Sequence, residues 1–82
     1  MAFSVVTYSN HARERMTERS ISKRQVELTL FRPDSVRLSK GRLIAERRTT
    51  AGNTIRVVYR EQLTNQGQTA HVITVIRLAG IT

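Results

Sequence analysis

The chain has 82 residues and a mass of 9.4 kDa, so we expect a single domain over residues 1–82. This size excludes a large cofactor fold such as a dinucleotide-binding domain, and the absence of cysteine excludes disulfides, thiolate metal sites and a cysteine nucleophile. The 14 basic residues outnumber the 6 acidic ones, and most are arginine, whose planar fork holds phosphate at two points. This surplus favours a polyanionic partner, with nucleic acid first and an acidic protein second.

Membrane association and export have little support in the sequence. No apolar stretch approaches the roughly 18 residues needed to span a bilayer, and residues 1–6 lack the basic start and long apolar run of a secretory signal. No long amphipathic helix carries the positive charge onto a membrane surface. We expect a cytoplasmic protein with no membrane partner.

The first third of the chain carries helical signals. Residues 3–8 are β-prone but short, so they form either a first strand or an extended lead-in. Ser9 or Asn10 then caps a helix that runs over residues 11–19. Ser22 begins an S-x-x-Q capping box, which predicts a second helix ending at about Leu30 or Phe31, before Pro33. Ile21 and Val26 are placed to form the hydrophobic staple of that second helix.

After Pro33 the hydrophobic period changes to two, which indicates strands. We predict strands over residues 35–39, 42–49, 54–61 and 69–78, with a polar loop over 62–68. In the last strand, alternation puts one set of residues on one face and the rest on the other: His71, Ile73, Val75 and Arg77 against Val72, Thr74, Ile76 and Leu78. The predicted fold is α+β, with two N-terminal helices packed on one face of a three- to four-stranded antiparallel meander.

One candidate for chemistry is a stripe on the first predicted helix. His11, Arg15, Glu18 and Arg19 share a face there, and an imidazole is suited to proton transfer at neutral pH. The plainer interpretation is a surface histidine among Glu–Arg ion pairs.

A second candidate is a set of strand arginines that could hold a phosphate backbone. The plainer interpretation is that the outward positions of any meander are polar. Thr74, amid apolar residues of the last strand, is either a ligand to phosphate or a β-branched filler. The arginines are Arg42, Arg47, Arg48, Arg56, Arg60 and Arg77.

No metal and no cofactor are expected. Two histidines sixty residues apart and six scattered acids form no ligand spacing. The glycines occur singly, so the chain has no glycine-rich phosphate loop.

Residues 11–22 read H-A-x-x-R-M-x-x-R-x-I-S and resemble the opening signature of a small prokaryotic domain family of unknown function. The resemblance continues through Gly41-Arg42, Val57-Val58-Tyr59 and Val72-Ile73-Thr74-Val75, with Ser20 in place of the usual glycine. That family resembles in turn the barnase/EndoU/colicin/RelE superfamily of small ribonucleases, which includes RelE- and ParE-like toxins of toxin–antitoxin pairs.

The resemblance implies a metal-independent endoribonuclease in which an RNA 2′-OH attacks its own phosphate. His11 would act as the base, Arg15 and Arg19 would offset the phosphate charge, and Thr74 would bind a phosphate oxygen. The strand arginine that assists them is left open among Arg42, Arg47 and Arg48. The resemblance also implies an acidic antitoxin partner. The alternative is a non-catalytic module that binds nucleic acid or protein through the same basic face.

Overall fold

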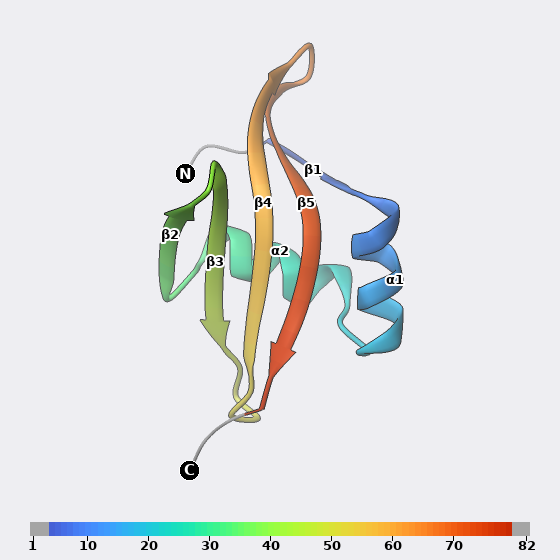
Figure 1. Cartoon of the computed structure of the whole chain (residues 1–82), viewed down its shortest axis with the longest axis vertical. Coiled ribbons are helices and arrows are strands. Elements are labelled where there is room, and N and C mark those ends of the chain that lie inside the picture. The colour runs from blue at the N-terminus through green and yellow to red at the C-terminus, as the bar shows by residue number, and fades with distance from the viewer. Residues whose placement is uncertain (1–3, 80–82) are drawn as a thin grey trace.

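The computed structural model describes residues 4–79, which form two helices and five strands. The helices are α1 (Asn10–Glu18) and α2 (Lys23–Phe31). The strands are β1 (Val5–Tyr8), β2 (Ser35–Ser39), β3 (Arg42–Arg48), β4 (Thr54–Thr64) and β5 (Gly67–Leu78). The strands form one sheet in the order β1-β5-β4-β3-β2 (Figure 1).

The antiparallel meander that the sequence predicts is wrong as a description of the whole sheet. The β2–β5 strands are antiparallel neighbours, but β1 pairs parallel to β5, with Val5 opposite Thr69 and Tyr8 opposite Val72. The sheet is therefore mixed and has five strands. A parallel partner cannot be reached through a short turn, so local patterning does not reveal it. The predicted first residue of this segment, Phe3, lies outside the described residues.

Both predicted helix starts are confirmed. The Ser9 hydroxyl accepts a hydrogen bond from the Ala12 N–H at 3.0 Å and so caps α1. Ser22 and Gln25 form the reciprocal capping box of α2, with distances of 3.1 and 3.0 Å. The capping satisfies backbone N–H groups that have no partner inside a helix.

The two helices meet different parts of the sheet. Figure 1 shows α2 crossing behind the sheet, where it packs on β3 and β4, and α1 lying beside β5. The core between them is apolar and almost fully buried. Its helical members and the following Ile21 are Ala12, Met16, Ile21, Val26 and Leu30, and its strand members are Ala45, Ile55, Val57, Tyr59, Ala70, Val72 and Val75.

A β-bulge changes the alternation of β5. Val58 pairs with Thr74, whereas the next residue, Tyr59, pairs with Val72, so the register skips Ile73. The Ser9 hydroxyl donates to the Ile73 carbonyl at 2.9 Å, and the Ser9 N–H donates to the Val72 carbonyl at 3.0 Å. The residue that caps α1 therefore also binds the bulge. Such bulges re-aim the side chains that follow them.

The predicted polar loop over residues 62–68 is wrong. β4 continues to Thr64 and β5 begins at Gly67, so the two strands form a long hairpin with a tight turn. The Thr64 hydroxyl accepts from the Gln66 N–H at 3.2 Å, and Gly67 has a φ of 104°. A polar composition is typical of a loop. Hairpin strands that extend beyond the core bury neither face, so they can have the same polar composition.

We expect Ser9→Ala to destabilise the protein more than Ser22→Ala. Each variant loses a helix cap, worth about 1 kcal/mol, but Ser9→Ala also leaves the part-buried Ile73 carbonyl without its hydroxyl donor. Thermal and urea unfolding should show a loss of about 1 kcal/mol for Ser22→Ala and about 2 kcal/mol for Ser9→Ala. Ser39→Ala, on the exposed strand β2, is the control and should be nearly neutral. Equal losses at Ser9 and Ser22 would show that the hydrogen bond from Ser9 to the Ile73 carbonyl adds nothing to stability.

Candidate nucleic-acid interface

The pairing of residues on neighbouring strands shows which side chains lie on the face of the sheet that the helices leave uncovered. Paired residues on neighbouring strands share a face, and Ala45, Val57 and Val75 form a row that is fully buried under the helices. The adjacent row, which therefore lies on the other face, runs across four strands as Arg37, Ile44, Val58 and Thr74. We call this second surface the open face. Its strand residues are half-buried or exposed, except Thr69, which is buried.

Five arginines lie on the open face around a narrow apolar strip. The strip consists of Ile44, Val58 and Ile76, all half-buried. The register places the arginines on this face of β2, β3 and β4: Arg37, Arg42, Arg48, Arg56 and Arg60. Among the residues that the register rows place on this face, Glu46 is the one acid, so the open face is strongly positive.

Glu46 neutralises part of this charge. Its Oε2 lies 2.6 Å from Arg56 Nε and 3.8 Å from Arg37 Nη2, so one carboxylate serves two guanidiniums. Both arginines remain partly exposed and keep other N–H groups directed to solvent or to a ligand. This cluster fixes two arginines in place without cancelling their combined charge.

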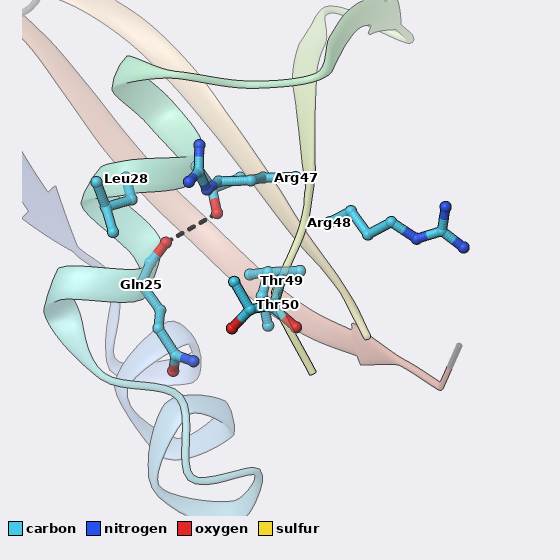
Figure 2. Close-up of a pocket in the computed structure, with 8 residues that line it drawn as sticks. Gln25, Leu28, Arg47, Arg48, Thr49 and Thr50 are labelled. Carbon is cyan, nitrogen blue, oxygen red and sulfur yellow. Dashed lines mark hydrogen bonds between the residues drawn. The ribbon is translucent and has the colours of Figure 1, made fainter. Parts of the chain in front are cut away.

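Arg42, Arg48 and Arg60 are free side chains on the open face. All are exposed, and the structure gives their guanidiniums no hydrogen bond or ion pair with any residue in 4–79. Figure 2 shows the Arg48 side chain extending away from α2, opposite to the direction of Arg47. Because no protein group occupies these donors, they are available for phosphate oxygens.

Arg47 and Arg77, which the sequence groups with the other strand arginines, lie on the helix-covered side. Arg47 Nη1 donates to the Arg32 carbonyl at 3.0 Å, beyond the last turn of α2. Arg77 Nη2 donates to the Ser20 carbonyl at 3.0 Å, in the turn between the helices. Each arginine binds a backbone carbonyl at a helix end, which is a structural role. We leave both out of the interface.

A small cavity of about 230 Å³ lies on the covered side, between α2 and the end of β3 (Figure 2). Gln25, Leu28, Arg47 and Thr49 are among its lining residues. Its volume is below the roughly 300–1,000 Å³ of ordinary small-molecule sites. Arg48 also contributes to its lining, at the end of β3, and the cavity is too small to hold a polynucleotide.

The stripe predicted on α1 is only partly assembled. Arg15 Nη1 forms a 2.6 Å ion pair with Glu18, which is the plainer of the two sequence interpretations for those residues. His11 and Arg19 are exposed, and His11 has no hydrogen-bond partner within the described chain. Arg13 lines a groove with Lys23 of α2. Because successive helical residues turn by about 100°, Arg13 and Arg15 lie on opposite flanks of the buried stripe of Ala12 and Met16.

The bulge corrects the predicted faces of β5. His71, Thr74 and Ile76 share the open face, whereas Val72 and Val75 both enter the core. Simple alternation would have placed His71 with Val75, under the helices. Thr74 is therefore brought to the open face as a candidate ligand, and His71 joins it there. The sequence pattern had no signal for the skipped residue.

His71 has a defined partner on the neighbouring strand. Its Nδ1 lies 2.8 Å from Thr7 Oγ1 of β1, and Arg60 of β4 is paired opposite it on the other side. His71 is half-buried, so its ring is held by the sheet. The sequence analysis overlooked Thr7 and Arg37 because it left β1 undecided and drew no consequence from the arginine in β2.

Neither tyrosine supplies a proton acceptor to this face. Burial, together with the Glu27 carboxylate that accepts the Tyr8 hydroxyl at 3.2 Å, raises the pKa of Tyr8 far above neutrality. Burial, with a smaller contribution from Glu61, also raises the pKa of Tyr59 above its ordinary value. Both phenols therefore stay protonated at neutral pH. Tyr59 belongs to the core, and Tyr8 packs against it.

Two further searches cover the part of the chain that the structure describes. Within residues 4–79, no three His, Asp or Glu side chains gather closely enough to hold a metal ion. Neither α1 nor α2 has the length and apolar character needed to cross a bilayer.

Comparison with known proteins identifies a family. No curated protein and no solved structure matches the chain. The sequence profile of one domain family matches residues 8–77, from the end of β1 almost to the end of β5. The matched region contains both helices and the central antiparallel strands of the open face. The chain therefore belongs to the domain of unknown function DUF4258.

Proposed function

We propose that this protein binds single-stranded RNA on the open face of its sheet. The observation that carries the proposal is the ring of five arginines around an uncovered apolar strip, with Glu46 as the acid among them. Like charges gathered on one face repel one another, and a bound polyanion relieves that repulsion. Three of the guanidiniums are exposed and have no partner in the described chain, so they can bind phosphates directly.

The apolar strip between the arginines favours a single strand over a duplex. Ile44, Val58 and Ile76 offer a surface to ribose and base faces, which are accessible only when bases are unpaired. The two tyrosines pack in or against the core, so stacking would depend on arginine planes. Contacts of this kind tolerate different bases. The proposed binding is therefore driven by phosphate charge and is weakly sequence-selective.

Cleavage of the bound RNA is the finer part of the proposal. Residues 11–22 resemble the signature of a domain family that itself resembles the RelE-like ribonucleases, and this two-step resemblance supports a metal-independent endoribonuclease that acts as a toxin. In this proposal the open-face arginines stabilise charge on the five-coordinate phosphorus, and Thr74 donates a hydrogen bond to a phosphate oxygen. Arg15 and Arg19 of α1 would extend the basic surface past β5.

We expect the Arg42→Gln/Arg60→Gln protein to bind RNA more weakly than the parent protein. Each lost phosphate contact should lower the slope of log K against log salt by about 0.7, so the double variant should lose about 1.4. Anisotropy titrations of a fluorescein-labelled oligouridine at several salt concentrations measure this slope. Affinity near physiological salt should fall by roughly tenfold or more.

The matched control is Arg13→Gln/Arg24→Gln, which removes the same charge from exposed helix positions. It should keep most of the parent slope. Equal losses in the two double variants would show that only net charge matters and would contradict the open-face proposal. A labelled duplex of the same length should bind less tightly than the single strand.

A second candidate is docking of an acidic, extended segment from a partner protein onto β2. Val36 and Leu38 are 47% and 72% exposed on this edge strand, and within residues 4–79 no strand pairs with its outer edge. Arg37 alternates with them and faces the other way. An added strand with apolar residues on one side and carboxylates on the other would match both faces. A second copy fits poorly, because two-fold pairing centred on Arg37 would set like charges opposite each other.

We expect a peptide of alternating glutamate and valine to bind the parent protein and to bind Leu38→Lys much more weakly. The substitution removes the apolar contact on β2 without touching the core. Isothermal titration measures the peptide affinity. Leu63→Lys is the control, since Leu63 is 82% exposed at the far end of β4, and it should bind like the parent. Equal binding by both variants, or a parent dimer in sedimentation, would exclude this docking mode.

A further inference from the structure

We propose that His71 is the proton-transfer residue that acts on RNA bound to the open face. This inference rests on the proposed RNA-binding function and assigns its catalytic group. Three observations carry it: the bulge that turns His71 to the open face, the hydrogen bond that holds its ring, and the arginine paired beside it. No other imidazole lies on the strand rows of the described chain, since His11 is on α1.

The bulge is what makes His71 available. It keeps Val72 and Val75 in the core together, although they are three residues apart, and so reverses the face of the residues before it. Without the skipped residue, an imidazole at position 71 would share the helix-covered face with Val75. Bulges are over-represented next to active sites because they re-aim a side chain in this way.

The parallel strand β1 provides the support. Thr7 is paired with His71, and its hydroxyl lies 2.8 Å from Nδ1. A hydroxyl can accept from a protonated Nδ1, which leaves the lone pair on Nε2. Within residues 4–79 the structure gives Nε2 no partner. The ring is therefore fixed through one nitrogen, and the other can exchange a proton with a ligand.

The charge around His71 suits a phosphate substrate. Arg60 is opposite His71 in the sheet register, and Arg42 lies on the same face of β3. Glu61 follows Arg60 in β4 and is paired with Ala70, which is buried in the core. The Glu61 side chain therefore lies on the helix-covered face and not on the open face. A phosphate held by Arg60 and Arg42 would thus lie beside the imidazole with no carboxylate of the same rows between them.

The reaction is a transesterification within the RNA. His71 Nε2 accepts the proton of a ribose 2′-OH, and the 2′ oxygen forms a bond to the adjacent phosphorus. The bond between phosphorus and the 5′ oxygen breaks, and its electron pair leaves on that oxygen, which takes a proton from water. The products are a 2′,3′-cyclic phosphate and a 5′-hydroxyl end, and His71 returns its proton to solvent. The step needs no metal ion or other co-reactant.

The experiment compares His71→Asn with His11→Asn in single-turnover cleavage of labelled RNA with chelator present. Asparagine keeps a polar group near the position of Nδ1 but cannot transfer the proton. We expect His71→Asn to lose about 100-fold or more in rate with an unchanged binding constant, and His11→Asn to stay within about threefold. Thr7→Val should lose activity in part, and Thr7→Ser, which keeps the hydroxyl, should restore it. Mass spectrometry should find the cyclic phosphate, and 2′-deoxy substitution at the cleaved linkage should block the reaction.

Failure of the inference and failure of the proposed function give different results. If the parent protein binds RNA but does not cleave it, or if His71→Asn cleaves at the parent rate, the catalytic assignment is overturned and RNA binding stands. If His11→Asn alone loses cleavage, the helix histidine is the base and the assignment to His71 is wrong. If the parent does not bind RNA, the proposed function itself fails.

Discussion

The position of α1 against the sheet and the bulge in β5 both depend on the hydrogen bonds of Ser9. This residue leaves β1, caps α1 through its hydroxyl, and binds the Val72 and Ile73 carbonyls of β5 with its N–H and hydroxyl. A single side chain therefore fixes the crossover from edge strand to helix and the site of the bulge. Because the hydroxyl donates and accepts at once, neither contact leaves an orphaned polar group. The faces of β5 on either side of the bulge follow from it.

The second constraint is electrostatic. Five arginines gathered on one sheet face destabilise the folded chain by mutual repulsion, and Glu46 offsets this by contacting Arg37 and Arg56 together. Arg47 and Arg77, by contrast, are used at helix ends, where carbonyl dipoles favour positive charge. The arginine surplus thus divides into a structural part and a part with no protein partner. Arg42, Arg48 and Arg60 belong to the second part and lie together on the open face, whereas Arg13, Arg19 and Arg24, whose side chains also have no partner within residues 4–79, lie on or beside the helices.

Local sequence signals predicted much of this fold. The caps at Ser9 or Asn10 and at Ser22, the end of α2 before Pro33 and the alternation of β3 and β4 follow from propensity and period, and the structure confirms them. The parallel pairing of β1 and the skipped Ile73 depend on contacts between distant segments, which periodicity does not encode. The same gap affects the candidate site. The sequence grouped six strand arginines, and the register brings four of them to the open face: Arg42, Arg48, Arg56 and Arg60. Alternation also grouped His71 with Val75, from which the bulge separates it. Its partner Thr7 lies on the strand that the sequence left undecided.

The bulge fixed by Ser9 and the positive charge of the open face both determine the surroundings of His71. Burial of Val72 and Val75 in the core requires the bulge but does not require a polar residue at position 71. Instead the re-aimed position holds an imidazole, flanked by a hydroxyl on β1 and a guanidinium on β4. A histidine used only for packing needs neither an adjacent free arginine nor a partly exposed ring. The juxtaposition of a supported imidazole and unpaired arginines on one uncovered surface is the reason for proposing a phosphate-transfer site here and not only a basic sheet.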